Sequence, residues 1–348
     1  MGPHAVASST AESDTLLREI GALAERDLGA RPARIERIAG GGVSHRGFFR
    51  LFLPGATAIA RVDRGEPGPG VLPEPPLEPL RSFLEAAGLP VPHRLGGDAS
   101  RRIDLLEDAG TTTLEDAVRA EPALRRPLYE EACDWIAALQ RLVDPSGRVE
   151  AFRRRLDATL FAVKARRFAT SGLPALLGRA ATDAETRCVH AAFDAVAESL
   201  AAAPVRLAHR DYMSRNLLVR PGAAAGGRLV MIDLQGALLA PPEYDLVCLL
   251  RDTYVTLADA EVASLAERAR VRLPAPPDPA TFARRFDLLT VTRKAKDFAL
   301  CHELAARGDP SWLPFAAATI GYVRRALGRV ARGDARLAAL AELVGAAA

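Results

Sequence analysis

Apolar residues recur at two different spacings in the first third of the chain. Over residues 12–28 they return every three to four positions, which predicts an amphipathic helix that Ser13 would cap. Between residues 34 and 63, short apolar runs are separated by Gly40–Gly42 and by a turn at Pro54–Gly55, and this pattern predicts three short antiparallel strands. A loop rich in proline and glycine, a helix and a further strand are expected to follow, over residues 65–79, 80–87 and 101–108.

Helical spacing dominates after Thr113, and apolar runs of strand type return only at residues 205–208, 217–219 and 229–232. We therefore expect an α+β protein with two lobes. A small β-rich N-lobe would span residues 1–108, and a larger helical C-lobe would span residues 109–348. The helices of the C-lobe are expected over residues 114–120, 124–142, 152–168, 180–203, 246–253, 259–271, 283–306 and 313–330.

Composition narrows the class of protein. Of the 348 residues, 49% are hydrophobic and 26% are charged, which is typical of a globular chain and excludes a disordered, collagen-like or coiled-coil one. No apolar run reaches the roughly 18 residues that a membrane helix needs, and a net charge of +3 gives little support to nucleic-acid binding. The four cysteines are far apart and the N-terminus lacks the pattern of a secretory signal. We expect a cytoplasmic monomer with reduced thiols and neither a membrane nor a nucleic-acid partner.

The most informative segment lies between the strand-like runs of the C-lobe. His209, Arg210 and Asp211 are followed five residues later by Asn216, and the run at 229–232 leads directly into Asp233. This order matches the kinase catalytic loop H-R-D-x-x-x-x-N and the metal-binding aspartate that follows it. Asp211 can accept the proton of an attacking hydroxyl, while an amide oxygen and a carboxylate are ligands that Mg²⁺ prefers. The sequence therefore predicts transfer of a phosphoryl group from ATP, with Asn216 and Asp233 holding Mg²⁺.

The N-lobe carries candidates for binding the nucleotide. The glycine run and Ser44 stand between two predicted strands, so their backbone N–H groups could cover the phosphates of ATP. A glycine run is also common in a plain hairpin turn, and that alternative stays open. Backbone carbonyls of the LLED segment, at the end of the N-lobe, would meet the adenine base, but the segment could equally be a plain strand end. The nucleotide-binding candidates in this part of the chain are Gly41, Gly42, Ser44, Arg46 and Glu107.

One residue of the protein-kinase pattern is missing. That pattern has a lysine on the third strand, but no lysine precedes Lys164 in this chain. The local match AIAR puts Arg61 at that place, and it is the candidate to serve the phosphates. The alternative is that Arg61 is an exposed strand residue while Arg46 or Arg50 faces the nucleotide. The carboxylate partner of this cation would be Glu78 or Glu85.

Longer stretches of the chain resemble a known family. GGVSHRGFFRL, LLED, HRDYMSRNLLV, IDLQGALLAPPEYDLVCLLRDTYV and TRKAKDFALCHELAARGDPSWLPF together span nearly the whole sequence. They resemble the aminoglycoside phosphotransferase-like kinases, and within them the bacterial N-acetylmuramate/N-acetylglucosamine anomeric kinases. The resemblance implies a bilobal protein-kinase-like fold that uses ATP and Mg²⁺. It also implies phosphorylation of the anomeric C1 hydroxyl of an amino sugar in peptidoglycan recycling.

The resemblance assigns roles to particular positions. It makes Asp211 the catalytic base and Asn216 and Asp233 the ligands of Mg²⁺. Independently of the resemblance, the catalytic-loop motif predicts that His209 holds the loop backbone, and Asp245 in EYDL is expected to cap or brace that loop. The relatives often carry an acidic helix where this chain reads AFRRRLDATLFAVKARRF, so the precise sugar stays open. Arg251 and Asp252 could equally form an ion pair with each other on a helix. The candidates to line the sugar pocket are Arg215, Gln235, Arg251 and Asp252, with Tyr254 and Lys296 beside them.

Two other interpretations are possible. A kinase for another small hydroxyl acceptor, such as an aminoglycoside, choline or homoserine, would carry the same catalytic loop. The basic stretch RRFDLLTVTRKAKD suits an acidic sugar such as muramate better than a cationic acceptor. A pseudokinase would explain the missing strand lysine, but the complete set of Asp211, Asn216 and Asp233 opposes it. A protein kinase is disfavoured because Pro241–Glu243 follow Asp233 too closely for a long activation loop.

Overall fold

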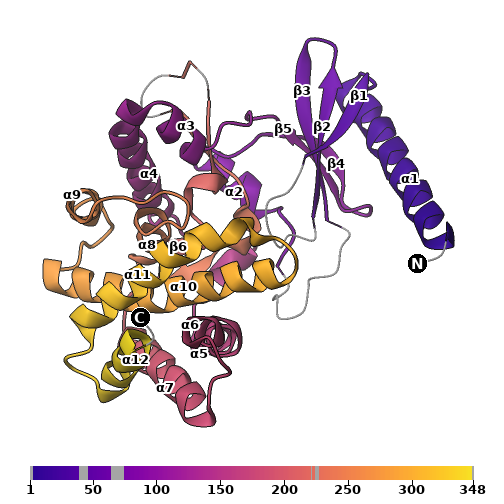
Figure 1. Ribbon diagram of the computed structural model, residues 1–348. Helices are drawn as coiled ribbons and strands as arrows, with labels where there is room; N and C mark the ends of the chain where they lie inside the picture. The colour runs from indigo at the N-terminus through magenta and orange to yellow at the C-terminus, as the bar shows by residue number, and fades with distance from the viewer. Residues whose placement is uncertain (1–2, 39–45, 64–73, 221, 224–226, 347–348) are drawn as a thin grey trace. The chain divides into compact units, whose positions relative to one another are not determined.

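The computed structural model describes residues 3–38, 46–63, 74–220, 222–223 and 227–346. The chain forms two compact units, which we call the sheet unit and the helical unit. The sheet unit consists of Met1–Glu74 and Val91–Gly110, and the helical unit of Pro75–Pro90 and Thr111–Ala348 (Figure 1). The expected boundary after residue 108 lies two residues before the last boundary between the units. The segment 75–90, expected in the N-lobe, groups with the helical unit.

The sheet unit is built on a five-stranded antiparallel sheet in the order β1-β2-β3-β5-β4. The helix α1 (Pro3–Leu28) packs along it, as Figure 1 shows, and the apolar face of this helix is buried against the sheet. The three strands expected between residues 34 and 63 are confirmed, and α1 begins earlier than residue 12. The strands are β1 (Arg34–Ile38), β2 (Gly47–Leu53), β3 (Ala56–Val62), β4 (Arg94–Asp98) and β5 (Ile103–Glu107). The core residues include Ile20, Leu23, Phe49, Leu51, Val62 and Leu105.

Strand β4 was not predicted, because its sequence RLGGD offers only one apolar side chain. The strand is specified instead by its fit to α1. The backbone N–H of Gly97 donates to the carboxylate of Asp27 at 2.8 Å, and a Cβ at Gly96 would lie 2.5 Å from an oxygen of the same carboxylate. Only glycine permits this close approach of helix and strand.

The helical unit surrounds one long helix, α10 (Pro279–Ala306), which packs against α5, α7, α8, α9 and α11 (Figure 1). The expected helix over residues 152–168 begins only at Ala158, because Asp157 caps it by accepting from the N–H of Leu160 at 3.0 Å. No helix of the described chain is long and apolar enough to cross a membrane. The other helices are α2 (Leu80–Ala86), α3 (Leu114–Ala120), α4 (Arg125–Leu139), α5 (Ala158–Arg167), α6 (Leu173–Leu177), α7 (Asp183–Leu200), α8 (Tyr244–Leu250), α9 (Asp259–Arg270), α11 (Leu313–Val330) and α12 (Ala335–Ala346).

Two short antiparallel strand pairs position the predicted catalytic segment. Strand β6 (Arg206–Ala208) pairs with β9 (Leu238–Ala240), and β7 (Leu217–Val219) pairs with β8 (Leu229–Met231). The three strands expected here are confirmed, whereas β9 was not predicted. The register aligns the start of β7 with the end of β8. The N–H of Ile232 donates to the carbonyl of Asn216 at 3.0 Å, so the residues before β7 and after β8 share one edge.

Candidate active site

A buried carboxylate on α8 holds the backbone of the catalytic loop. Asp245 accepts from the N–H of His209 at 2.7 Å and from the N–H of Arg210 at 3.0 Å. The ring of His209 reaches the carbonyl of Ile232 at 2.9 Å and so ties the loop to the end of β8. Arg210 has a φ of 79°, a left-handed conformation that is costly for a residue with a Cβ. The expectation that His209 and Asp245 brace the loop is confirmed.

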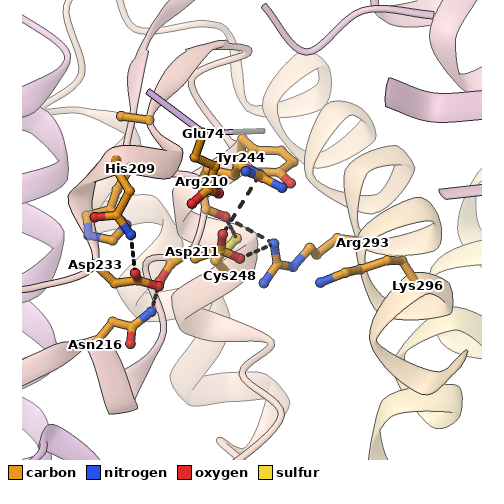
Figure 2. A network of polar contacts seen from close by, with 12 residues as sticks. Glu74, His209, Arg210, Asp211, Asn216, Asp233, Tyr244, Cys248, Arg293 and Lys296 are labelled. Atoms are coloured by element: carbon orange, nitrogen blue, oxygen red, sulfur yellow. Dashed lines mark hydrogen bonds and ion pairs between the residues drawn. The ribbon is translucent and has the colours of Figure 1, made fainter. Parts of the chain in front are cut away.

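The side chain of Asp211 lies within a group of cations (Figure 2). Arg293 on α10 donates to its Oδ1 at 2.9 Å, and Arg210 Nε lies 3.8 Å from its Oδ2. Burial alone would raise the pKa of this carboxyl, but the charges of Arg293, Arg210 and Lys296 outweigh burial and hold the pKa of Asp211 below its ordinary range. Asp211 is therefore an ionised hydrogen-bond acceptor at neutral pH.

The two predicted metal ligands lie next to Asp211. Asn216 donates through its amide nitrogen to the carbonyl of Asp211 at 2.8 Å, which fixes the orientation of its amide group. Asp233 follows β8 in a left-handed conformation with a φ of 63°, and Gln235 donates to its Oδ1. Figure 2 shows Asn216 and Asp233 on one side of Asp211.

The donor set fits Mg²⁺ by its chemistry. Asn216 and Asp233 offer one amide oxygen and one carboxylate, and Mg²⁺ usually takes one or two protein ligands together with substrate phosphates and waters. Within the described residues, no group of three histidine, cysteine or acidic side chains could hold a metal on its own. A site of this kind would bind Mg²⁺ together with a nucleotide.

The cationic candidates of the sheet unit share acidic partners. The guanidinium of Arg61 pairs with Asp63 at 2.7 Å and with Asp104 at 3.0 Å. Arg46 pairs with Asp63 at 3.3 Å and with Glu74 at 2.6 Å. The side chains of both arginines are less than 10% exposed, so Arg61 is not the exposed strand residue of the alternative interpretation. These contacts place Arg46 and Arg61 in one buried network centred on Asp63.

Other candidates of the nucleotide site have partners of their own. Arg50 pairs with Asp108 at 2.7 Å, and Glu107 accepts from the N–H of His93 at 3.1 Å. The two glutamates considered as partners of the strand cation, Glu78 and Glu85, both pair with Arg81 within the helical unit. The predicted phosphate-covering residues Gly41, Gly42 and Ser44 lie outside the described residues.

The candidates for the sugar pocket occupy three places. Gln235 donates to Asp233, the predicted metal ligand. Arg215 pairs with Glu115 at 2.6 Å and stacks over the ring of Tyr254, with 3.8 Å between its Cζ and the ring centroid. Asp252 accepts from the N–H of Ser214 at 2.9 Å and so braces the far end of the catalytic loop. Arg251 is the C-cap of α8 and pairs with Asp259 at 2.7 Å, not with its chain neighbour.

Sequence reasoning missed two cations near Asp211. Arg293 contacts Asp211 directly, and Lys164 on α5 donates to the hydroxyl of Tyr244 at 3.1 Å. Burial and the charges of Arg293 and Lys296 lower the pKa of Lys164 to about 7. The sequence did hold one signal for Lys164: only Lys164, Lys294 and Lys296 are lysines among the 46 lysine and arginine residues.

Comparison with known proteins gives consistent results. A family model described as "Phosphotransferase enzyme family" matches residues 34–282. The N-acetylmuramate/N-acetylglucosamine kinase of Pseudomonas putida is 28% identical over 285 residues, which cover 78% of each chain. The protein of the same name from Neisseria meningitidis is 28% identical over 312 residues, 86% of this chain and 88% of its own.

Solved structures show the same fold at low sequence identity. The choline kinase LicA of Streptococcus pneumoniae is similar with a TM-score of 0.61 at 14% identity, over 92% of this chain and 99% of its own. A spectinomycin phosphotransferase in complex with ADP and spectinomycin is similar with a TM-score of 0.58 at 13% identity, over 95% of this chain and 98% of its own. The expected kinase-like α+β fold is thereby confirmed.

Proposed function

The chain belongs to the phosphotransferase enzyme family and is an ATP-dependent kinase, and from that premise we propose that it phosphorylates the anomeric C1 hydroxyl of N-acetylmuramate, N-acetylglucosamine or both. The reaction would serve peptidoglycan recycling. The relatives at 28% identity bear the name of kinases for these two sugars. The observation that carries the proposal is the ionised Asp211, fixed by Arg293 on a loop that also presents Asn216 beside Asp233.

Asp211 would receive the acceptor hydroxyl. A carboxylate whose pKa lies below its ordinary range is a weak base, so its first task is to orient the hydroxyl by accepting a hydrogen bond. In a loose transition state the hydroxyl proton leaves late, and the carboxylate accepts it as the new P–O bond forms. Arg293 acts through Asp211 by fixing the direction in which Oδ1 points.

The nucleotide side of the reaction would depend on the metal ligands and the sheet unit. Asn216 and Asp233 would hold Mg²⁺, which when bound neutralises charge on the transferred phosphoryl group. Gln235 would keep the Asp233 carboxylate oriented toward the metal. Gly41, Gly42, Ser44, Arg46, Arg61 and Glu107 remain our candidates for contacts with ATP.

The charge around Asp211 favours the amino sugars over the alternative acceptors. Choline is a quaternary ammonium ion and aminoglycosides carry several ammonium groups, and both would meet Arg293 and Lys296 near the catalytic carboxylate. Two like charges about 4 Å apart in a partly desolvated site repel by about 4 kcal/mol. That repulsion is on the order of the whole binding free energy of a weakly bound small ligand. A neutral or acidic sugar meets no such repulsion.

We also propose a cytoplasmic monomer. ATP is a cytoplasmic phosphoryl donor, and the four cysteines of the chain are free thiols. Size-exclusion chromatography at micromolar concentration would give an apparent mass near 37.1 kDa for a monomer.

The test is ADP release from ATP and Mg²⁺ with five acceptors: N-acetylmuramate, N-acetylglucosamine, glucosamine, kanamycin and choline. Phosphorus NMR of the product would show a phosphate coupled to the anomeric proton. We expect turnover with one or both N-acetylated sugars and loss of at least about 1000-fold in Asp211→Asn. Asp194→Asn, at an exposed position of α7, is the matched control and should keep full activity.

Each contrary outcome has a distinct meaning. Turnover only with kanamycin or choline would refute the amino-sugar proposal and support the alternative acceptor class. A phosphate at another sugar hydroxyl would refute the anomeric assignment alone. Full activity in Asp211→Asn would refute the role of this carboxylate. Removal of Mg²⁺ by EDTA should abolish turnover, and Asp233→Asn should raise the Mg²⁺ concentration needed for half-maximal rate by about 10-fold or more.

A further inference from the structure

The three lysines of the chain gather around one segment of α10. Lys294 and Lys296 both donate to the carboxylate of Asp297, at 2.6 Å and 3.0 Å. Lys164, from α5, is close enough to Lys296 and Arg293 for their charges to lower its pKa. Arginine supplies the other 43 of the 46 lysine and arginine side chains, so lysine occurs nowhere else in the sequence. A compact ammonium group differs from a planar guanidinium in what it can bind. The clustering of all three lysines in one region therefore indicates a chemical role for their ammonium groups.

The positive charges here outnumber the carboxylates that they contact. Arg293 donates to Asp211 at 2.9 Å and to Asp297 at 3.2 Å, and Asp297 also serves two lysines. Among the described residues, Lys164 has a phenol rather than a carboxylate as its hydrogen-bond partner. Arg293, Lys294 and Lys296 thus share two carboxylates in a largely buried region, and Lys164 adds a further cation whose partner is a phenol. Buried positive charge without a counter-charge is costly, and a bound anion would remove that cost.

The lysines divide into one structural residue and two that remain accessible. Lys294 is 1% exposed and bridges α10 to Thr253 and Asp297. The side chain of Lys296 is 20% exposed, and Lys164 is also partly exposed. In Figure 2 the ammonium of Lys296 extends along Arg293 toward Asp211. Only Lys164 and Lys296 are therefore placed to meet a ligand.

The two sides of Asp211 differ. Asn216 and Asp233 lie on one side of it, and Arg293 and Lys296 lie on the other (Figure 2). In an in-line transfer the acceptor oxygen attacks the phosphorus from the side opposite the leaving oxygen of ADP. The metal ligands belong to the phosphate side, so the cations on the far side face the acceptor.

We propose that Lys164 and Lys296 bind a carboxylate substituent of the acceptor whose hydroxyl Asp211 orients, and that they favour an acidic amino sugar over its neutral counterpart. This inference rests on the proposed function and names the substrate class within it. N-acetylmuramate differs from N-acetylglucosamine by a lactyl ether that carries one carboxylate. The two sugars therefore form a matched pair that reports on this subsite alone.

The experiment compares kcat/KM for the two sugars in wild type, Lys164→Met and Lys296→Met. Methionine removes the charge while keeping an unbranched side chain. We expect the ratio of N-acetylmuramate to N-acetylglucosamine activity to fall by about 10- to 100-fold in each variant, mainly through KM for N-acetylmuramate, because a hydrogen-bonded ion pair is lost. Lys296→Arg, which keeps the charge, should restore most of the ratio. Arg307→Met, at an exposed position just after α10, is the control and should leave the ratio unchanged.

Failure of this inference is separable from failure of the proposed function. Wild-type turnover of both sugars with a ratio that neither methionine variant changes would overturn the anion subsite alone. A rise in KM for ATP with an unchanged ratio would assign the lysines to a nucleotide phosphate and also overturn it. No wild-type turnover of either sugar would overturn both proposals. Circular dichroism checks folding, and Lys164→Gln and Lys296→Gln replace any methionine variant that fails to fold.

Discussion

Glu243 gives the sharpest prediction about stability. It precedes α8 in the helical unit, and its side chain is fully buried. Among the described residues neither carboxylate oxygen has a hydrogen-bond partner, and the closest cation is Arg285, at 3.7 Å. Burial raises the pKa of Glu243 from 4.5 to about 7, against the smaller opposing effect of Arg285. The folded protein therefore binds this proton more tightly than the unfolded chain does.

The magnitude follows from this difference in pKa. Each pKa unit corresponds to about 1.4 kcal/mol, so ionised Glu243 destabilises the fold by about 3 kcal/mol relative to its protonated form. The stabilising contribution of the protonated form is complete below pH 4.5 and is lost as pH rises through 7. Glu243→Gln removes the charge at nearly constant volume. We expect it to raise the free energy of unfolding by about 3 kcal/mol at pH 8 and by less than about 1 kcal/mol at pH 5.

The assay is urea denaturation at both pH values, followed by tryptophan fluorescence. Both tryptophans, Trp135 and Trp312, lie in the same unit as Glu243, so the signal reports on the relevant part of the protein. Glu342→Gln, at an exposed position of α12, controls for the loss of a charge in general. A stabilisation by Glu243→Gln that is the same at pH 5 and pH 8, or a loss of stability at pH 8, would refute the reasoning.

Three further predictions concern the loop, the acceptor and a helix end. Asp245→Asn replaces one of the two carboxylate oxygens that accept from the N–H groups of His209 and Arg210. Steady-state kinetics should show kcat lower by about 10-fold or more, and an unchanged kcat would contradict the bracing role. Because Lys164 loses its charge above a pKa of about 7, kcat/KM for N-acetylmuramate should fall relative to N-acetylglucosamine as pH rises from 6 to 9, and parallel pH profiles would argue against it. Thr182→Ala breaks the capping box that opens α7 and should cost about 1 kcal/mol of unfolding free energy with kcat intact, whereas a loss of kcat would show a link to the site.

Local motifs explain what the sequence could predict. The segment from His209 to Asn216 and the strand before Asp233 are close in the chain, so spacing alone places them together, and the family resemblance built on them is confirmed. The short strands β6 and β7 were recognised for the same reason, because each is a brief apolar run beside the motif.

Contacts distant in sequence explain what the sequence could not predict. Arg293 reaches Asp211 across 82 residues, and α10 is buried on most of its surface, so no apolar stripe marks which side faces the site. Arg61 pairs with Asp104 through the register of β3 with β5, which depends on the whole sheet. Only packing of complete elements fixes such contacts.

Asp297 also limits how the acceptor preference of this enzyme can be redesigned. A substitution of Lys296 by glutamate, made to attract a cationic acceptor, would put a second carboxylate where an ammonium now lies 3.0 Å from Asp297. The two anions would repel each other in a largely buried position, and the protein would lose stability before it gained a substrate. Neutralising Asp297 in the same step removes that repulsion but leaves Lys294 without its carboxylate. The positions are epistatic, and libraries that vary one residue at a time will miss the combinations that work.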